Sequence, residues 1–274
     1  MGLVELDACV RGLGSVLVAF SGGADSAFLL ARAVSVLGTD RVVAATAASP
    51  SLPRSELDAA AGFARGLGVR HDTPRTEEMD RPGYRANAGD RCFFCKAELL
   101  DVLAPLAARL GLAYVATGTN ADDAVAGFRP GIRAAAERGA VTPLLDAGMT
   151  KAEVRAESRA MGLSTWDKPA AACLSSRIAY GVEVTPARLT RVERAESALR
   201  AAMSAAGLAV RDLRVRDLGP AGARVEVDPE LVSVLAARPD LLAAVGGFES
   251  VAVDPRGFRS GSMNELLPDP ARYR

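Results

Sequence analysis

Residues 21–26, Ser-Gly-Gly-Ala-Asp-Ser, have the side chains and backbone freedom that phosphate binding requires. The apolar run 16–20 precedes them and an Ala/Leu-rich stretch follows, which predicts a turn between a buried strand and a helix. Adjacent glycines let the backbone approach a ligand closely, and the N–H groups and dipole of a helix N-terminus favour an anion. The Asp25 carboxylate can hold Mg²⁺ against bound phosphates. We therefore expect a phosphate site at this turn.

The cysteines form a second group of residues that could bind a metal or take part in catalysis. Cys92 and Cys95 are predicted to lie in the first turn of a helix, where the helix dipole favours thiolates. A zinc site needs about four ligands, and the single histidine, His71, falls on a predicted strand where a structural role is favoured. An iron–sulfur cluster can be held by three thiolates, with Cys173 as the third. Alternatively, Cys173 is a buried structural cysteine, and Cys9 is interpreted as a small apolar residue of an N-terminal helix.

These residues must be positioned by a sheet and its helices. The first half of the chain alternates between the two kinds of element, which predicts a parallel sheet covered on both faces. The predicted strands are 16–20, 41–47, 69–72 and 113–117, and the predicted helices are 24–37, 54–67 and 92–110. Ligands bind beyond the carboxyl ends of such strands, where Ser21 and Gly118 fall. Thr150 and Glu153 form a capping box for a further helix that ends near Gly162.

The remainder of the chain predicts a small α+β domain. Residues 166–180 have no clear period and are expected to form a mobile connection. A long helix follows, beginning after Thr185 and ending near Gly207. Three strands, 212–218, 224–228 and 250–254, accompany a helix that starts at residue 229. The predicted domains are 1–180 and 181–274.

Composition narrows the class of protein. The 33 basic and 33 acidic residues balance, which indicates no nucleic-acid partner. No apolar run reaches the ~20 residues of a membrane span, and the acidic N-terminal segment lacks the basic region of a signal peptide. The expected location is therefore the cytoplasm, where four cysteines are not a disulfide framework. Lysine is rare, with only Lys96, Lys151 and Lys168, so each is a candidate for a role that needs a compact charge.

The hexapeptide resembles the PP-loop of ATP pyrophosphatases. It lacks the lysine of the mononucleotide P-loop and the spacing of the dinucleotide fingerprint. The resemblance implies an adenine nucleotide α-hydrolase-like α/β fold. It also implies an enzyme that cleaves ATP between the α- and β-phosphates and transfers AMP to a substrate oxygen. In that superfamily ammonia or sulfur then attacks the adenylate.

Further segments resemble the LarE family of ATP-dependent sulfur transferases, in the family's order over essentially the whole chain. They are GTNADD (118–123), FRPG (128–131), TKAEVR (150–155), KPAAACLSSRIAYG (168–181), LRVRD (213–217), ARVEV (223–227) and GFRSGSMNE (257–265). The family makes pyridinium bisthiocarboxylate mononucleotide, the organic part of the nickel-pincer cofactor of lactate racemase. The resemblance implies a small-molecule substrate, no membrane partner and a homo-oligomer.

The resemblance also implies roles for individual residues. The phosphates and Mg²⁺ of ATP would be held by Ser21, Gly22, Gly23, Asp25 and Ser26. The second strand-end loop would contribute Gly118, Thr119 and Asn120, with Asp122 or Asp123 assisting the metal. Lys151 would neutralise phosphate charge. Arg214 and Arg216, which alternate along a predicted strand and so share a face, would bind the substrate phosphate. Glu196 and Glu226 match carboxylates near the substrate and metal.

Two sulfur sources stay open for Cys173. Some family members give up the sulfur of this cysteine, which becomes dehydroalanine. Others use three cysteines to bind a [4Fe–4S] cluster whose open iron holds a sulfide. The pair Cys92 and Cys95 makes this sequence resemble the second group. The alternative functions are a tRNA thiolase of the same superfamily and a catalytically silent nucleotide sensor.

Overall fold

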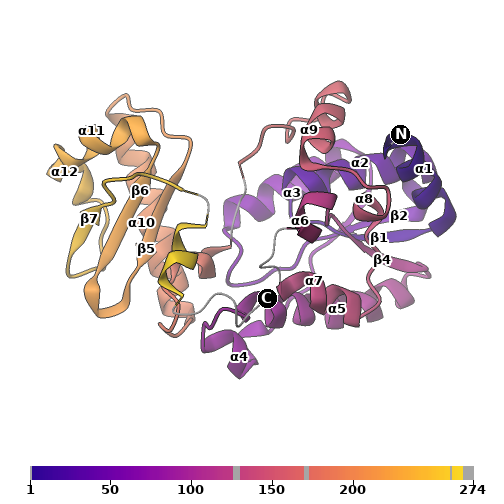
Figure 1. Cartoon of the computed structure of the whole chain (residues 1–274), viewed down its shortest axis with the longest axis horizontal. Coiled ribbons are helices and arrows are strands. Elements are labelled where there is room, and N and C mark those ends of the chain that lie inside the picture. Colours follow the sequence, from indigo (N-terminus) through magenta and orange to yellow (C-terminus); the bar gives the residue numbers. More distant parts are fainter. Residues whose placement is uncertain (1, 126–129, 170–172, 260, 268–274) are drawn as a thin grey trace. The chain divides into compact units, whose positions relative to one another are not determined.

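The computed structural model describes residues 2–125, 130–169, 173–259 and 261–267 (Figure 1). Contacts between Cα atoms divide the chain into two compact units. The first unit comprises residues 1–78, 92–171 and the last two residues, and the second comprises 79–91 and 172–272. Among the described residues, no helix has both the length and the apolar character needed to span a bilayer.

The first unit is built on a four-stranded parallel sheet. Its strands are β1 (Val16–Ala19), β2 (Val42–Ala45), β3 (Arg70–Asp72) and β4 (Tyr114–Thr117), in the spatial order β3-β2-β1-β4. Val16 pairs in register with Val42 on one side and Tyr114 on the other. The carboxyl ends of β1 and β4 therefore meet at one edge, which confirms the predicted parallel sheet.

Helices cover both faces of this sheet. Alternate strand residues point in opposite directions, so Val16 and Val18 join a core with Phe28, whereas Leu17 joins another core with Leu103. The principal helices are α1 (Gly2–Leu13), α2 (Ala24–Leu37), α3 (Arg54–Gly66), α5 (Arg91–Arg109) and α9 (Lys151–Ala160). The shorter ones are α6 (Ala121–Val125), α7 (Pro130–Glu137) and α8 (Pro143–Asp146). The predicted α/β fold is confirmed and agrees with the PP-loop superfamily.

The predicted capping box starts α9. The Thr150 side chain accepts a hydrogen bond from the Glu153 N–H, and the Glu153 carboxylate accepts one from the Thr150 N–H at 2.8 Å. These reciprocal bonds satisfy two backbone donors that a helix N-terminus otherwise leaves unpaired. They fix where α9 begins, and so where Lys151 lies.

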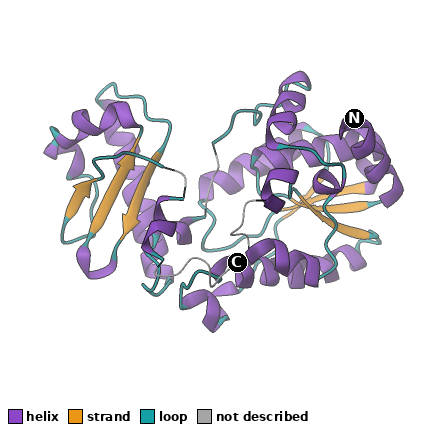
Figure 2. Ribbon diagram, viewed as in Figure 1, coloured by secondary structure: helices purple, strands orange, loops and turns teal. Residues whose placement is uncertain are grey.

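The second unit contains a three-stranded sheet and a long helix (Figure 2). The strands β5 (Leu213–Asp217) and β6 (Ala223–Val227) are antiparallel, and β7 (Val251–Val253) lies parallel to β6. The helix α10 (Pro186–Ala205) packs Leu199 and Met203 into the core of this sheet. The helix expected from residue 229 begins as a 3-10 turn, η5 (Pro229–Leu231), and continues as α11 (Val232–Ala236). The other short helices are α4 (Pro82–Arg85) and α12 (Pro239–Leu242).

Residues 79–91 belong to the second unit although they interrupt the first in sequence. The buried Asn87 has φ +53°, and its Nδ2 donates to the carbonyls of Ala179 (2.8 Å) and Val182 (2.9 Å). Arg91 Nη1 donates to the Ser175 carbonyl at 2.8 Å. These bonds join residues 87–91 to residues 175–182, which lie about 90 positions later in the sequence.

The expected mobile connection over 166–180 is corrected by this arrangement. Residues 170–172 lie outside the described residues. From Cys173 onward the chain forms a 3-10 helix, η3 (Leu174–Arg177), whose Ser175 and Arg177 side chains are buried. The absence of periodicity reflects a turn stabilised by distant polar partners. Local sequence cannot reveal those partners.

Candidate active site

The hexapeptide forms a closed turn between β1 and α2. The Ser21 N–H donates to Ser26 Oγ at 3.3 Å, and Ser26 Oγ donates to the Gly23 carbonyl at 3.1 Å. Gly22 has φ +72°, a conformation that favours glycine. Within the described residues, α2 begins at Ala24, and its N-cap, Gly23, provides no side-chain cap. A helix N-terminus without a side-chain cap is an arrangement that favours an anion, and the phosphate site stays a prediction.

Gly118 brings the loop after β4 against this turn. A β-carbon at position 118 would lie 2.8 Å from the Ser26 nitrogen and 3.0 Å from its Cα. Because those atoms are backbone, only glycine permits the approach. The next residue, Thr119, shares a 3.1 Å hydroxyl contact with Thr117. The structure thus brings the two predicted strand-end loops together.

Asp25 lies where these loops meet. Its Oδ1 accepts a hydrogen bond from Asn120 Nδ2 at 3.2 Å, and Asn120 is held by Asp123 through two backbone contacts of 3.3 and 3.1 Å. Burial raises the pKa of Asp25, against the lowering effects of the Lys151 ammonium and the Asn120 hydrogen bond. A second negative charge, on Asp123, raises it further. A cation would relieve this unfavourable burial.

The carboxylates of Asp25 and Asp123 suit Mg²⁺ better than a metal ion whose ligands are all protein side chains. In the described part of the chain, no three His, Cys, Asp or Glu side chains gather as ligands for one metal ion. Mg²⁺ commonly takes one or two carboxylates and completes its shell with water and substrate phosphates. Asp25 and the nearby Asp123 offer carboxylates of this kind.

The three lysines of the chain all belong to the first unit, and each interacts there with a charged side chain or a backbone carbonyl. Lys168 Nζ donates to the Gly22 carbonyl at 3.0 Å and to Glu56 Oε2 at 2.7 Å. Lys151 acts electrostatically on Asp25, and its N–H donates to Asp122 at 2.8 Å. Lys168 was missing from the predicted site residues. The scarcity of lysine was the signal that could have identified it.

Lys96 lies one residue beyond the cysteine pair on α5. Burial lowers the pKa of its ammonium, whereas the charges of Cys95, Cys92 and Asp123 raise it. Cys92 and Cys95 fall in the first unit and Cys173 in the second, so the prediction that they share a cluster stays a prediction.

A cavity of about 550 Å³ adjoins the hexapeptide. Its lining includes Gly22, Lys168, Phe63, Leu163 and the buried Thr165. This volume is within the range of small-molecule sites, and the lining combines apolar walls with a few polar groups.

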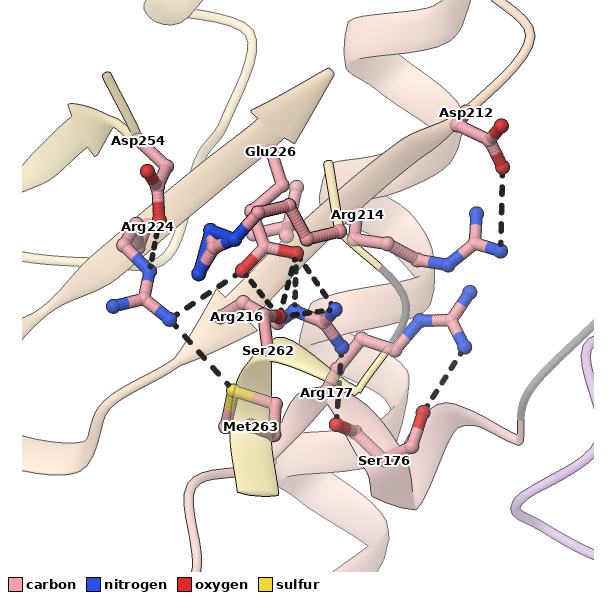
Figure 3. Close-up of polar contacts among 12 residues, drawn as sticks. Ser176, Arg177, Asp212, Arg214, Arg216, Arg224, Glu226, Asp254, Ser262 and Met263 are labelled. Carbon is pink, nitrogen blue, oxygen red and sulfur yellow. Dashed lines mark hydrogen bonds and ion pairs between the residues drawn. The ribbon is translucent and has the colours of Figure 1, made fainter. Parts of the chain in front are cut away.

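In the second unit, Arg216 and Glu226 form a buried ion pair (Figure 3). Arg216 Nε and Nη2 donate to Glu226 Oε2 at 2.9 and 2.6 Å, and Arg216 Nη1 donates to the Ser176 carbonyl at 3.2 Å. Ser262 Oγ donates to the same carboxylate, and Arg224 lies 3.4 Å from its Oε1. Arg216 and Glu226, both predicted site residues, are thus ion-pair partners.

Arg214 has a different environment on the same strand. Its Nη1 donates to the Leu213 carbonyl at 2.8 Å, its Nη2 lies 3.9 Å from Asp212, and its guanidinium lies over the Phe258 ring. Burial lowers the pKa of Arg214, and the positive charges of Arg177 and Arg216 lower it further. The carboxylates of Glu196 and Asp212 act in the opposite direction, so Arg214 lies in a cluster of buried charges of both signs.

Glu196 forms an ion pair with Arg177, which was not among the predicted site residues. Glu196 accepts from Arg177 Nε at 2.9 Å and Nη2 at 3.2 Å, and Arg177 Nη1 donates to the Cys173 carbonyl at 3.1 Å. The sequence signal for Arg177 was its position four residues after Cys173 in a polar stretch.

Comparisons with known proteins agree with this arrangement. No family model matches the chain. An uncharacterised protein of Synechocystis sp. is 43% identical over 93% of this chain and 94% of its own length. The pyridinium-3,5-bisthiocarboxylic acid mononucleotide synthase of Lactiplantibacillus plantarum is 34% identical over 96% of this chain and 93% of its own length. The chain therefore belongs to the LarE family, that of the pyridinium-3,5-bisthiocarboxylic acid mononucleotide synthases.

Proposed function

We propose that this protein is an ATP-dependent sulfur transferase. It adenylates a pyridinium carboxylate mononucleotide and converts it to the thiocarboxylate, a step of nickel-pincer nucleotide cofactor synthesis. The observation that carries the proposal is the contact of Gly118 with Ser26, because it joins both strand-end loops at Asp25. The similarity to the Lactiplantibacillus plantarum synthase supports the choice of substrate.

In the first step, a carboxylate oxygen of the substrate attacks the α-phosphorus of ATP. The bond to the bridging oxygen breaks, and pyrophosphate leaves with that electron pair. The N–H groups of residues 21–26 would bind the phosphates, while Lys151 and Lys168 supply positive charge near them. Mg²⁺ held by Asp25 would neutralise charge on the leaving pyrophosphate.

The substrate phosphate is assigned to Arg214 rather than to Arg216. Arg216 donates two hydrogen bonds of 2.9 and 2.6 Å to the Glu226 carboxylate, whereas the Arg214 guanidinium lies 3.9 Å from the Asp212 carboxylate. Charge-assisted hydrogen bonds from a guanidinium suit a phosphate group. Arg216 and Glu226 would then support the strand that carries Arg214, and Glu196 would orient Arg177.

In the second step, sulfur attacks the acyl carbon and AMP leaves with the carbon–oxygen bonding pair. We propose that Cys92, Cys95 and Cys173 bind a [4Fe–4S] cluster, because a sacrificial Cys173 gives no role to the cysteine pair. Such a cluster has one iron without a protein ligand, which can carry the sulfide. The position of Cys92 and Cys95 one turn apart at the start of α5 supports their assignment as two of the ligands.

The test is product formation by protein purified without air. ATP, Mg²⁺, sulfide and the pyridinium biscarboxylate mononucleotide should yield pyrophosphate, AMP and a product in which sulfur replaces oxygen, detected by mass spectrometry. Pyrophosphate release that depends on tRNA rather than on the mononucleotide would favour the thiolase alternative. Absence of release with either substrate contradicts the adenylation step.

A further inference from the structure

The backbone carbonyl of Cys173 receives three hydrogen bonds. The donors are the Ser176 N–H at 3.0 Å, Ser176 Oγ at 2.7 Å and Arg177 Nη1 at 3.1 Å. A 3-10 turn needs only the first bond, and a serine hydroxyl commonly adds the second. The guanidinium is the unusual donor, because it is charged and the Arg177 side chain is only 5% exposed.

Arg177 is fixed in turn by Glu196 on α10. The two parallel contacts of 2.9 and 3.2 Å form a bidentate pair, which sets the plane of the guanidinium. This orientation leaves Nη1 facing Cys173. Burying an ion pair has a desolvation penalty that can exceed its Coulombic gain, so stability alone is a weak reason for its presence.

Glu196 also reaches the strand that carries Arg214. Its Oε1 accepts a hydrogen bond from the Val215 N–H at 2.9 Å. Because β5 is an edge strand, this N–H lies on a side without a strand partner. One carboxylate thus links the turn that contains Cys173 to the strand that contains Arg214.

We infer that Arg177 is the positioning residue of Cys173 and that Glu196 orients Arg177. The inference rests on the proposed function, in which Cys173 handles sulfur and Arg214 binds the substrate. Fixing the carbonyl fixes the Cα of Cys173 and so the origin of its side chain. A displacement of about 1 Å at a reacting group can reduce a rate on the order of 100-fold. The Glu196–Arg177 pair therefore holds the sulfur-handling residue in register with Arg214.

The experiment compares the full-length wild type, Arg177→Gln, Arg177→Lys and Glu196→Gln, all prepared without air. Hydrogen–deuterium exchange of residues 173–179 measures positioning without turnover. Steady-state formation of thiocarboxylate measures its consequence. We expect Arg177→Gln to accelerate exchange in this segment at least about tenfold and to lower kcat by about 10- to 100-fold. The KM for ATP should stay within about twofold, because the hexapeptide belongs to the other unit.

Arg188→Gln is the matched control. Arg188 Nη1 donates to both oxygens of Asp217, at 2.9 and 2.8 Å, and so also links α10 to β5 by an ion pair. Arg188→Gln should lower the melting temperature while leaving kcat and the exchange of residues 173–178 unchanged. Ala179 is left out of this comparison because its N–H donates to the Asp217 carbonyl. Arg177→Lys keeps the charge with a single ammonium and should recover part of the lost kcat. Glu196→Gln should resemble Arg177→Gln in a milder form.

Two results would overturn the inference. One is unchanged exchange at 173–179 in both Arg177→Gln and Glu196→Gln. The other is a loss of kcat in Arg188→Gln as large as in Arg177→Gln, which would show a general effect of stability. If the wild type forms no thiocarboxylate, the proposed function fails, and the exchange measurement still decides whether the pair positions Cys173.

Discussion

Gly118 and Ser26 are in such close contact that position 118 has no room for a side chain. A β-carbon there would lie 2.8 Å from the Ser26 nitrogen, and backbone at the start of a helix cannot yield as a flexible side chain can. The contact joins the loop after β4 to the hexapeptide. It therefore decides whether Asn120 reaches Asp25.

We expect Gly118→Ala to abolish ATP-dependent pyrophosphate release. The methyl group would separate the two loops and break the Asn120–Asp25 hydrogen bond. Gly12→Ala is the control, since nothing lies within 4 Å of a β-carbon there and α1 is helical at that position. It should raise stability by up to about 1 kcal/mol with full activity. Wild-type pyrophosphate release by Gly118→Ala would contradict the assigned contact.

Asp25→Asn should remove pyrophosphate release without unfolding the protein. Burial raises the pKa of Asp25 above its unfolded value of about 3.9, so the folded state binds more protons in the window between the two values. The stability contributed by the protonated carboxyl is present below this window and lost as pH rises through the folded pKa. The uncharged amide should therefore melt no lower than the wild type at neutral pH.

The same shift predicts the acid limb of wild-type activity. Because Mg²⁺ needs the ionised carboxylate, activity should fall at a pH above the ordinary value for aspartate. The pH dependence of kcat/KM for pyrophosphate release at subsaturating Mg²⁺ measures this limb, because kcat/KM reports the free enzyme. A release that persists in Asp25→Asn would remove Asp25 from the metal site.

Arg214→Ala and Arg216→Ala should have different effects. Loss of Arg214 should weaken mononucleotide binding by about 1.5–3 kcal/mol, roughly 10- to 150-fold, with little change in ATP affinity. Loss of Arg216 leaves the fully buried Glu226 without its closest cation and should destabilise the protein by about 3–5 kcal/mol. Calorimetry and denaturant unfolding separate the two results. Equal losses of affinity for ATP and mononucleotide in Arg214→Ala would argue against a substrate site.

Asp217 should govern part of the acid stability of the second unit. Burial alone raises the pKa of this carboxyl, but hydrogen bonds from Arg191, Gly219 N and Arg188 outweigh it and hold the pKa below the ordinary value. Its contribution is present above about pH 4 and is lost as pH falls through the folded pKa. Asp217→Asn should cost about 1.5–3 kcal/mol at neutral pH and flatten this acid dependence. An unchanged pH profile of unfolding would contradict the pairing.

Local sequence predicts the parts of this molecule that local interactions determine. The helix over 24–37 and the capping box at Thr150 follow from neighbouring residues, as does the turn between β1 and α2. Asn87 illustrates the opposite case, because its partners lie 92 and 95 positions away at Ala179 and Val182. No pattern near residue 87 indicates that this segment joins the second unit.

In the candidate site, too, some features follow from local sequence and others depend on distant residues. The residue types of the hexapeptide indicate phosphate binding wherever the strand and helix form. Alternation along β5 places Arg214 and Arg216 on one face, but it cannot show that Glu226 and Ser262 bond to Arg216 and not to Arg214. Pairing among charged residues depends on distances across the fold, which a sequence pattern does not contain.

The last prediction concerns the three cysteines assigned to the cluster. Protein prepared and reconstituted without air should be brown and hold about four irons per chain. Alanine at Cys92, Cys95 or Cys173 should remove most of that iron, because each thiolate would be one of only three protein ligands. Cys9→Ala is the matched control and should keep it, since Cys9 belongs to α1 and not to the proposed ligand set.

Turnover then separates the two sulfur sources. With a cluster and added sulfide, each chain should form more than one thiocarboxylate, and its intact mass after removal of iron should stay constant. A sacrificial Cys173 would instead stop after one sulfur and lose the mass of hydrogen sulfide, whether or not iron is present. Colourless protein that shows this mass loss would reverse our assignment.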